Sequence, residues 1–294
     1  MDAIILCAGE GRRLRPMSLH RAKPLFPLVC KPILAHILEK LQDNGIYRAA
    51  ANIWYRQEDF IRFGERVGIG AMGLSLVQEE SLLGTGGGLS NAARALNPRD
   101  TFLVHNGDIY CEAPITPAIR EHRSSGALIT MMVRAGGEEV IESNGYVVDI
   151  IGKLGISGDK GWKYTGISIW EPDALRYLPR PGYSGGMIEG IIELIRTIPN
   201  SVAIYDIGDE RWSDIGTEQE YLRIHRELLK GGLYPESTDI PNSTRISGFV
   251  CVCSGAVIES GCQLRNVLVW PDGFVSRGSI LENAVVGPFG VVRV

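Results

Sequence analysis

The sequence predicts an α/β protein, with a Rossmann-like, mostly parallel sheet covered by helices on both faces and a short left-handed parallel β-helix at its C-terminal end. Short apolar strands alternate with amphipathic helical patterns as far as about residue 230. After Gly231-Gly232 the helical periodicity stops, and aliphatic residues recur about every six positions. We therefore expect a catalytic domain over residues 1–232, a linker over 233–245 and a hexapeptide-repeat tail over 246–294.

The first part of the chain reads as strands and helices in alternation. The apolar run 3–6 is typical of a strand buried on both faces. Pro32 suits the first turn of a helix, and the apolar residues behind it fall on one helical face. Thr217 and Glu220 form a capping box that opens a helix through about Leu229. Further strands are expected at 49–54, 74–78, 102–105, 128–133, 164–170 and 202–207, and further helices near 57–67, 87–96, 115–123 and 186–196.

The tail has the spacing of a coil built from short strands. The aliphatic positions are Ile246, Val252, Ile258, Leu264, Val269, Val275, Leu281 and Val286. Steps of five or six residues fit one short strand on each side of a triangular parallel β-helix. A pair of ordinary hairpins is the alternative.

Composition limits the classes of function. The 294 residues carry a formal net charge of −4, which argues against a nucleic-acid partner. There is no apolar stretch of about 18 residues, so no membrane span is expected. No signal peptide is visible, and the six cysteines contain no CxxC pair. We expect a cytoplasmic protein with reduced, structural thiols.

The first chemical motif is the loop after the first strand, which reads Cys7-Ala8-Gly9-Glu10-Gly11-Arg12-Arg13-Leu14-Arg15-Pro16. A Rossmann fingerprint needs a third glycine where Leu14 stands, and a Walker loop needs a GKS or GKT sequence that is absent. A plain glycine turn is the simplest alternative. The arginines and the later Lys23-Pro24 instead favour a triphosphate site, because glycine lets backbone N–H groups approach phosphate oxygens.

Two aspartates follow predicted strands. Asp108 comes after the apolar run 102–104, and Asp214 stands three residues before the capping Thr217. Each alone reads equally well as a turn or cap residue. Together they match Mg²⁺, which takes one or two carboxylates plus substrate phosphates.

These motifs resemble the sugar nucleotidyltransferases, also called nucleoside-diphosphate-sugar pyrophosphorylases, over essentially the whole chain. The matching positions are Gly9, Gly11, Arg13, Leu14, Pro16, Lys23, Pro24 and a second Lys-Pro at Lys31-Pro32. The resemblance implies that Arg13 holds the β- and γ-phosphates and that Lys23 neutralises charge at the α-phosphate. It also implies that Asp108, in an N-G-D turn, and Asp214, in a W-x-D-I-G-T segment, hold the metal.

The resemblance also implies the remaining binding residues. For the nucleotide they are Leu6, Ala8, Gly9, Gly11, Arg13, Lys23, Glu79, Gly84, Thr85, Asn106, Gly107 and Asp108; for the sugar phosphate they are Asn144, Lys153, Thr165 and Gly166. The family often has Glu-Glu-Lys where this chain has Ile151-Gly152-Lys153. Glu79 or Glu80 facing the base would favour GTP, and Gln78 would favour UTP or dTTP.

The expected function is transfer of a nucleotide from an NTP, GTP or UTP, to a sugar 1-phosphate, with release of pyrophosphate. The motifs look most like mannose-1-phosphate guanylyltransferases and N-acetylmuramate-1-phosphate uridylyltransferases, and a heptose phosphate is a further candidate sugar. The alternatives are a catalytically inactive regulatory relative and an acyltransferase of the hexapeptide-repeat class. The tail is also expected either to join subunits of a homo-oligomer or to act as a cap that buries apolar surface.

Overall fold

The chain folds into two compact units. The computed structural model describes residues 1–67 and 73–294. The first unit contains Met1–Gly9 and Ile37–Trp212, and the second contains Glu10–His36 and Ser213–Val294. The early segment 10–36 therefore packs with the tail, although it lies inside the predicted catalytic domain. The domain boundaries predicted at residues 232 and 246 stay a prediction.

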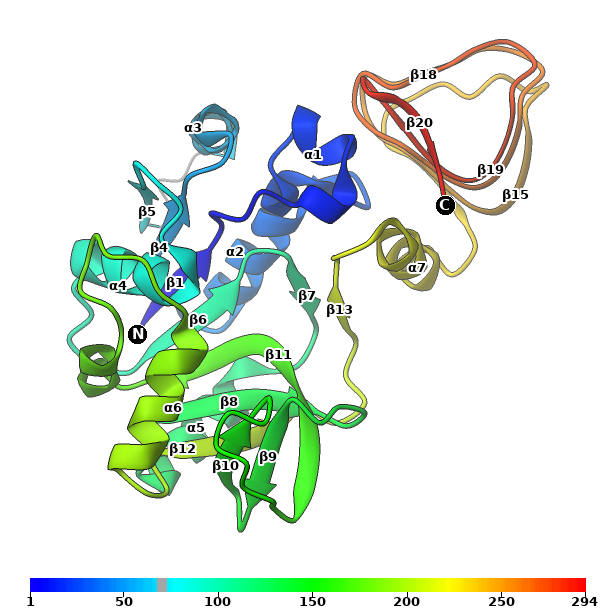
Figure 1. Ribbon diagram of the computed structural model, residues 1–294. Helices are drawn as coiled ribbons and strands as arrows, with labels where there is room; N and C mark the ends of the chain where they lie inside the picture. The colour runs from blue at the N-terminus through cyan, green and yellow to red at the C-terminus, as the bar shows by residue number, and fades with distance from the viewer. Residues whose placement is uncertain (68–72) are drawn as a thin grey trace. The chain divides into compact units, whose positions relative to one another are not determined.

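The first unit is built on a nine-stranded sheet (Figure 1). Its strand order is β5-β4-β1-β6-β11-β8-β12-β10-β9. The bounds are β1 Asp2–Leu6, β4 Arg48–Ile53, β5 Gly73–Gln78, β6 Phe102–Asn106, β8 Ile129–Arg134, β9 Val140–Ser143, β10 Tyr146–Ile150, β11 Lys160–Trp170 and β12 Val202–Asp206, with the short β7 Ile109–Cys111 outside this sheet.

The sheet is mixed rather than mostly parallel, which corrects the sequence expectation. The strands β5, β4, β1 and β6 are parallel, as are β8 and β12. β11 runs antiparallel to β6, β8 and β9, and β10 is antiparallel to both its neighbours. Antiparallel pairing depends on which strands meet, and the apolar pattern of one strand does not encode it.

Helices cover both faces of this sheet, as predicted. On β8, Met131 belongs to the core cluster that includes Leu89 of α4 and Ile191 of α6. Its neighbour Thr130 points to the opposite face, where its hydroxyl lies 2.8 Å from Nδ1 of His122 on α5. Successive strand residues alternate between faces, so one strand serves both layers. The helices are α3 Gln57–Val67, α4 Gly84–Leu96, α5 Ile115–Ser125 and α6 Met187–Thr197, with a 3₁₀ segment at Pro172–Tyr177.

The second unit joins one capped helix to the tail. Helix α7, Glu218–Leu229, begins at Thr217, whose side chain accepts a hydrogen bond from Glu220 N, so the predicted capping position is confirmed. In segment 10–36 the 3₁₀ turns Arg12–Leu14 and Lys23–Leu25 flank α1, Met17–His20. A small hairpin of β2, Pro27–Leu28, and β3, Lys31–Pro32, precedes α2, Ile33–Asp43, and β13 is Trp212–Asp214.

The tail consists of parallel strands stacked one coil apart (Figure 1). Ile246 pairs with Leu264 and Leu264 with Leu281, so the chain returns to the same side after about three short strands. The aliphatic positions predicted from the six-residue spacing fill the coil's own core cluster or pack against it. Among the described strands of the tail, β14 to β20, only β20 folds back on its neighbour β19 as a hairpin. The strands are β14 Leu233–Pro235, β15 Arg245–Val252, β16 Val257–Ile258, β17 Gln263–Val269, β18 Phe274–Val275, β19 Ile280–Gly287 and β20 Gly290–Arg293.

Three further observations concern the predicted linker, the cysteines and the helices. The predicted linker starts with a strand, because Leu233 of β14 pairs in parallel with Val250 of β15. Cys30 and Cys253 form a disulfide with Cα atoms 5.1 Å apart, so the expectation of reduced thiols is wrong for this pair. Among the described helices, none combines the length and the apolarity needed to cross a membrane.

Candidate active site

The loops after three parallel strands are tied together at one edge of the sheet in the first unit. Cys7, directly after β1, donates its N–H to Oδ1 of Asn52 on β4, at 2.9 Å. Gly107, after β6, donates its N–H to the carbonyl of Leu6, also at 2.9 Å. Carboxyl ends of parallel strands are where such sheets bind ligands. The predicted positions Leu6, Ala8, Gly9, Asn106, Gly107 and Asp108 thus share this edge.

Asp108 lies in the turn between β6 and β7, half-buried. Burial raises the pKa of the Cys7 thiol well above its usual range, and the charge of Asp108 raises it further. The carboxylate therefore acts electrostatically on the loop after β1 and keeps that thiol protonated. A Cβ atom on Gly9 would meet no atom within 4 Å, so packing does not require glycine there. The open space leaves the backbone accessible to a ligand.

Glu79 is the inward-facing member of Gln78-Glu79-Glu80. Its side chain is buried, whereas those of Gln78 and Glu80 are exposed. One carboxylate oxygen accepts a hydrogen bond from Asn52 Nδ2 at 2.7 Å, and the other accepts the N–H of Leu83 at 3.3 Å. Burial raises the pKa of Glu79, and the two hydrogen bonds oppose that shift. Glu79 thus holds the glycine-rich loop to β4.

Asn52 is a site residue that the sequence reasoning missed. Its amide oxygen positions Cys7 and its amide nitrogen positions Glu79, so one side chain joins two predicted binding loops. The available signal was a polar residue near the end of the apolar strand 49–54. Gly88 makes the arrangement possible, because a Cβ there would lie 2.4 Å from Asn52 Nδ2.

The glycine-rich segment 84–88, which forms the start of helix α4, packs against a second glycine-rich segment, 183–187. The N–H groups of Gly86 and Gly87 both donate to the carbonyl of Gly185, at 2.9 and 3.1 Å. Thr85 Oγ1 accepts the N–H of Met187, the first residue of α6, at 3.0 Å. The hydroxyl of Thr85 is thus already engaged in the protein. The segment 183–187 could have been noticed in the sequence from the turn-forming run Pro181-Gly182-Tyr183-Ser184-Gly185-Gly186.

The predicted sugar segment lies next to the Asp108 turn. Gly166 adopts a φ of +79°, and a Cβ atom there would lie 2.9 Å from Asn106 Nδ2. Thr165 is buried; its hydroxyl donates to the carbonyl of Met132 at 2.7 Å, and its carbonyl accepts from Trp212 Nε1 at 2.8 Å. This segment coincides with a register shift of β11 against β8. Backbone groups freed from regular pairing are available to a ligand.

Asn144 and Lys153 lie elsewhere in the first unit. Asn144 is exposed in the turn between β9 and β10, beside a cavity of about 440 Å³ lined partly by Glu121, Glu142 and Asp206. Three carboxylates would repel a sugar phosphate. Lys153 is exposed in the turn after β10. The structure therefore gives no geometric support for phosphate binding by either side chain, and both assignments stay predictions.

The second unit brings the predicted cationic residues to Asp214. Lys23 is buried, and its Nζ lies 3.7 Å from Oδ1 of the half-exposed Asp214. A Cβ atom on Gly216 would lie 3.0 Å from Arg13 Nη2 and 3.2 Å from Asp214 Oδ1, so both side chains approach this glycine. Gly11, with a φ of +63°, packs against the Lys23 side chain. The positive φ favours glycine at this position, and a Cβ atom there would lie 3.3 Å from Ser18 Cβ.

The three arginines of the loop differ in their partners. Arg12 donates to both oxygens of Glu10, at 2.6 and 2.8 Å, and Arg15 lies 3.4 Å from the same carboxylate. The hydrogen bonds from Arg12 hold the pKa of Glu10 below its ordinary value. Within the described part of the chain, exposed Arg13 has no carboxylate within 4.0 Å that would neutralise it. Arg13 is thus the arginine of this loop that retains an unneutralised charge.

The chain is similar in sequence to known proteins. A sequence profile described as "Nucleotidyl transferase" matches residues 2–231. UTP–glucose-1-phosphate uridylyltransferase from Synechocystis sp. is 27% identical over 97% of this chain and 82% of its own length. Mannose-1-phosphate guanylyltransferase from Mycobacterium tuberculosis is 26% identical over 96% of this chain and 83% of its own length.

Solved structures show the same fold. HddC from Yersinia pseudotuberculosis, complexed with GMP-PN, has a TM-score of 0.63 at 22% identity over 77% of this chain and 99% of that one. A putative glucose-1-phosphate thymidylyltransferase from Bacillus anthracis has a TM-score of 0.67 at 17% identity over 82% of this chain and 98% of that one. The chain belongs to the nucleotidyl transferase family. The resemblance found in the sequence is confirmed.

Proposed function

We propose that this protein transfers a nucleoside monophosphate group from an NTP to a sugar 1-phosphate and releases pyrophosphate. The observation that carries the proposal is the grouping of Lys23, Arg13 and Asp214 in the second unit, 3.7 Å separating Lys23 Nζ from Asp214 Oδ1. Two cations beside one carboxylate suit a metal-bound polyphosphate better than a purely structural ion pair. The named relatives that act on sugar 1-phosphates support the same substrate class.

The metal in this proposal is Mg²⁺, held by Asp108 and Asp214. The donor set fits, because both are half-buried carboxylates and hard oxygen ligands are what Mg²⁺ takes. When bound, Mg²⁺ supplies Lewis-acid polarisation of the α-phosphate and neutralises part of its charge. The proposal requires Asp108 and Asp214 to act on the same nucleotide.

The chain's own residues then provide positioning and charge. An oxygen of the sugar phosphate attacks the α-phosphorus, and the bond from that phosphorus to the bridging oxygen of the β-phosphate breaks as pyrophosphate leaves. Lys23 neutralises the negative charge that accumulates at the α-phosphate, held ready by its contact with Asp214. Arg13 stabilises the departing pyrophosphate, since its guanidinium offers five donors and has no protein carboxylate to serve first. No covalent enzyme intermediate is required.

In this proposal, backbone groups of two sets of residues contact the nucleotide. The first set lies at the edge of the sheet and contains Leu6, Ala8, Gly9, Asn106 and Gly107. The second set contains Gly11 of the second unit and Gly84 and Thr85 at the start of α4. Thr165 and Gly166 contact the sugar. Because the carboxylate of Glu79 is already bonded to Asn52 and Leu83, we assign it the positioning of the loop that receives the base. The base is guanine or uracil, and the sugar is of the mannose, heptose or N-acetylmuramate type.

The decisive measurement is pyrophosphate release with a panel of NTPs and sugar 1-phosphates in the presence of Mg²⁺. Asp108→Ala is expected to lower turnover roughly a hundredfold or more, since metal ligation contributes several kcal/mol to such a transition state. Asp173→Ala, which removes an exposed carboxylate from the 3₁₀ segment, is the control and should retain activity. Wild-type turnover in the Asp108 variant would remove the metal assignment. Failure of the wild type with every pair would favour an inactive regulatory relative, and turnover of acetyl-CoA would favour an acyltransferase.

We also propose that the tail is a left-handed parallel β-helix that joins subunits. Val257 and Phe274 pair in register on β16 and β18, and both are about half exposed. Contiguous exposed apolar side chains favour a contact with another protein surface. Light scattering should report an oligomer that Phe274→Lys dissociates. A monomeric wild type would exclude this role.

A further inference from the structure

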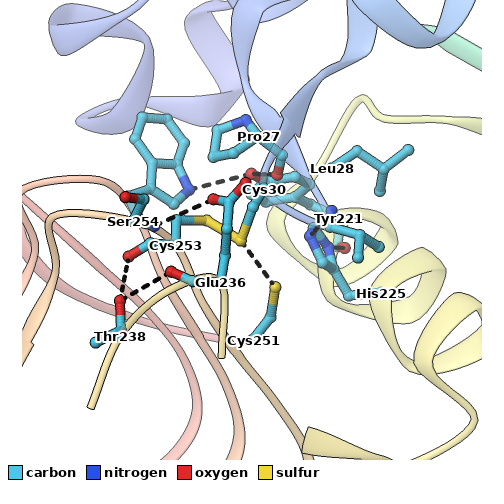
Figure 2. Close-up of a disulfide and its surroundings, with 12 residues drawn as sticks. Pro27, Leu28, Cys30, Tyr221, His225, Glu236, Thr238, Cys251, Cys253 and Ser254 are labelled. Atoms are coloured by element: carbon cyan, nitrogen blue, oxygen red, sulfur yellow. Dashed lines mark hydrogen bonds between the residues drawn. A yellow bond between two sulfur atoms is a disulfide. The ribbon is translucent and has the colours of Figure 1, made fainter. Parts of the chain in front are cut away.

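Three cysteine sulfur atoms converge in the second unit, outside the residues assigned to catalysis (Figure 2). Cys30 is bonded to Cys253, and the thiol of Cys251 lies only 3.4 Å from Cys30 Sγ. All three sulfur atoms lie within 4.8 Å of one another. Cys30 is 221 and 223 residues away from its two neighbours along the chain, so this convergence is produced by the fold.

Cys251 and Cys253 present their sulfur atoms from the same side of one strand. Cys251 lies in β15 and Cys253 directly follows its last residue, and side chains two positions apart along an extended chain share a face. The intervening Val252 points into the core of the coil. A third sulfur atom that lies against this face can therefore form a disulfide with either Cys251 or Cys253.

Cys30 is placed between them by a turn with an unfavourable backbone. Val29 and Cys30, the two residues joining β2 to β3, have φ values of 47° and 64°. Positive φ is rare for a β-branched residue such as valine and has to be imposed by surrounding contacts. His225 Nε2 accepts the N–H of Val29 at 3.1 Å, and the Tyr221 hydroxyl donates to the carbonyl of Pro27 at 2.6 Å. Helix α7 therefore fixes the turn that carries the sulfur.

We propose that Cys30, Cys251 and Cys253 form a thiol–disulfide exchange site, in which Cys30 is the common partner of either of the other two cysteines. A third thiol 3.4 Å from a disulfide sulfur needs little movement to attack it. In that step the Cys251 thiolate forms a bond to Cys30 Sγ, the bond from Cys30 to Cys253 breaks, and Cys253 leaves as a thiolate that takes up a proton. Electrons and atoms balance without a further oxidant.

When the reduced protein is oxidised, Cys30 is the first thiol to react. Its residue is half-buried, whereas Cys251 and Cys253 are fully buried. A small-molecule disulfide such as oxidised glutathione exchanges with the Cys30 thiolate and releases one glutathione thiol. The Cys253 thiolate then attacks Cys30 Sγ and releases the second glutathione thiol. Two protein thiols are oxidised and one glutathione disulfide is reduced.

In the unperturbed protein, the disulfide joins Cys30 to Cys253. Burial and, to a smaller extent, the nearby charge of Glu236 raise the pKa of Cys251 to about 12, against the opposing effect of the hydrogen bond with Cys30. The Cys251 thiol therefore stays protonated at neutral pH, and attack by it is slow. Cys251 becomes the partner when Cys253 is absent or already modified.

The site anchors the segment that carries Lys23. The link joins the hairpin at residues 27–32 to the strand end at Cys253, and Lys23 lies four residues before that hairpin. Under the proposed function, reduction loosens a phosphate-binding segment and raises the KM for the NTP. This last step rests on the proposed function, whereas the exchange chemistry does not.

The test is a disulfide map after equilibration with oxidised glutathione at pH 8, acid quenching, alkylation and mass spectrometry. The wild type and Cys251→Ser should contain Cys30–Cys253, and Cys253→Ser should contain Cys30–Cys251. Cys30→Ser should contain neither bond, and the control Cys262→Ser should match the wild type, although Cys262 is also buried near this coil. Circular dichroism checks that each variant is folded, and reduction and reoxidation of the wild type serves as a test free of substitutions.

Absence of the Cys30–Cys251 bond in folded Cys253→Ser would overturn the proposal. Uptake of one Zn²⁺ per reduced wild-type chain that then blocks reoxidation would also overturn it, since the three sulfurs would then form a metal site. A several-fold rise in the KM for the NTP on reduction of the wild type, absent in Cys30→Ser, supports the link to the Lys23 segment. An unchanged KM refutes that link, and no turnover in either redox state counts against the proposed function while the map still decides the exchange site.

Discussion

Acidification should destabilise the second unit through His225. The ring is fully buried between Tyr221 and Phe249, at centroid distances of 4.8 and 6.2 Å. Nε2 accepts the N–H of Val29 and Nδ1 lies 2.7 Å from the carbonyl of Tyr221, so the neutral ring carries its proton on Nδ1. Burial lowers the pKa of His225 from 6.5 to about 4. A second proton would remove the acceptor of Val29 and place a charge in an apolar site.

The size of the effect follows from this shift. The folded pKa lies below the unfolded one, so the unfolded chain binds the proton more tightly and stability is lost as the pH falls from 6.5 towards 4. A difference of about 2.5 units corresponds to about 3 kcal/mol, most of it lost by a pH of about 4.5.

The assay is urea unfolding at a series of pH values, with the Cys30–Cys253 bond kept oxidised and hydrogen exchange of α7 and tail peptides reporting the second unit. His225→Gln is the matched control, because a glutamine carbonyl can accept the Val29 N–H but does not titrate. Buried His105, whose pKa is also about 4, contributes equally to both proteins and cancels in the comparison. If His225→Gln loses as much stability on acidification as the wild type, the reasoning is refuted.

Three further substitutions test the loops. Gly88→Ala should lower the free energy of unfolding, measured by urea titration, by about 3 kcal/mol. The new Cβ displaces Asn52 and overpacks the start of α4, and this cost exceeds the gain in helix propensity. Additive effects of Gly88→Ala and Asn52→Ala would contradict that clash. Because the pKa of Glu79 is raised in the folded protein, the wild type should lose stability as the pH rises above 4.5, and Glu79→Gln should not show this loss. Parallel profiles of stability against pH for the two proteins would argue against the buried carboxylate. Thr217→Ala should lower the thermal stability of the second unit by about 1 kcal/mol and Thr217→Ser by less, and equal losses would exclude the hydroxyl cap.

Features encoded by local pattern could be predicted from the sequence. The apolar run 3–6 gave a strand buried on both faces, and the six-residue spacing gave the core positions of the tail. Thr217 and Glu220 gave the start of α7, because a cap is decided within four residues. The cationic residues Arg13 and Lys23 could be selected because their motif is contiguous in sequence.

Features that depend on distant partners could not be predicted. Whether Gln78, Glu79 or Glu80 points inward is decided by Asn52, 27 residues before Glu79. The antiparallel direction of β11 depends on its neighbours in the sheet, and cysteine spacing does not give disulfide connectivity across 223 residues. The acidic surroundings of Asn144 come from strands and helices that its own motif does not contain.

The packing of the early segment with the end of the chain has a consequence for biosynthesis. Phe26 packs on Trp270 and His20 on Phe289, with ring centroids 4.7 and 5.6 Å apart. A ribosome makes Phe26 long before its partner exists, so the arginine- and lysine-bearing loop must wait, unassembled, until translation is nearly complete. Premature termination anywhere in the coil would therefore yield a chain whose nine-stranded sheet can form while its segment 10–36 has no surface to fold upon.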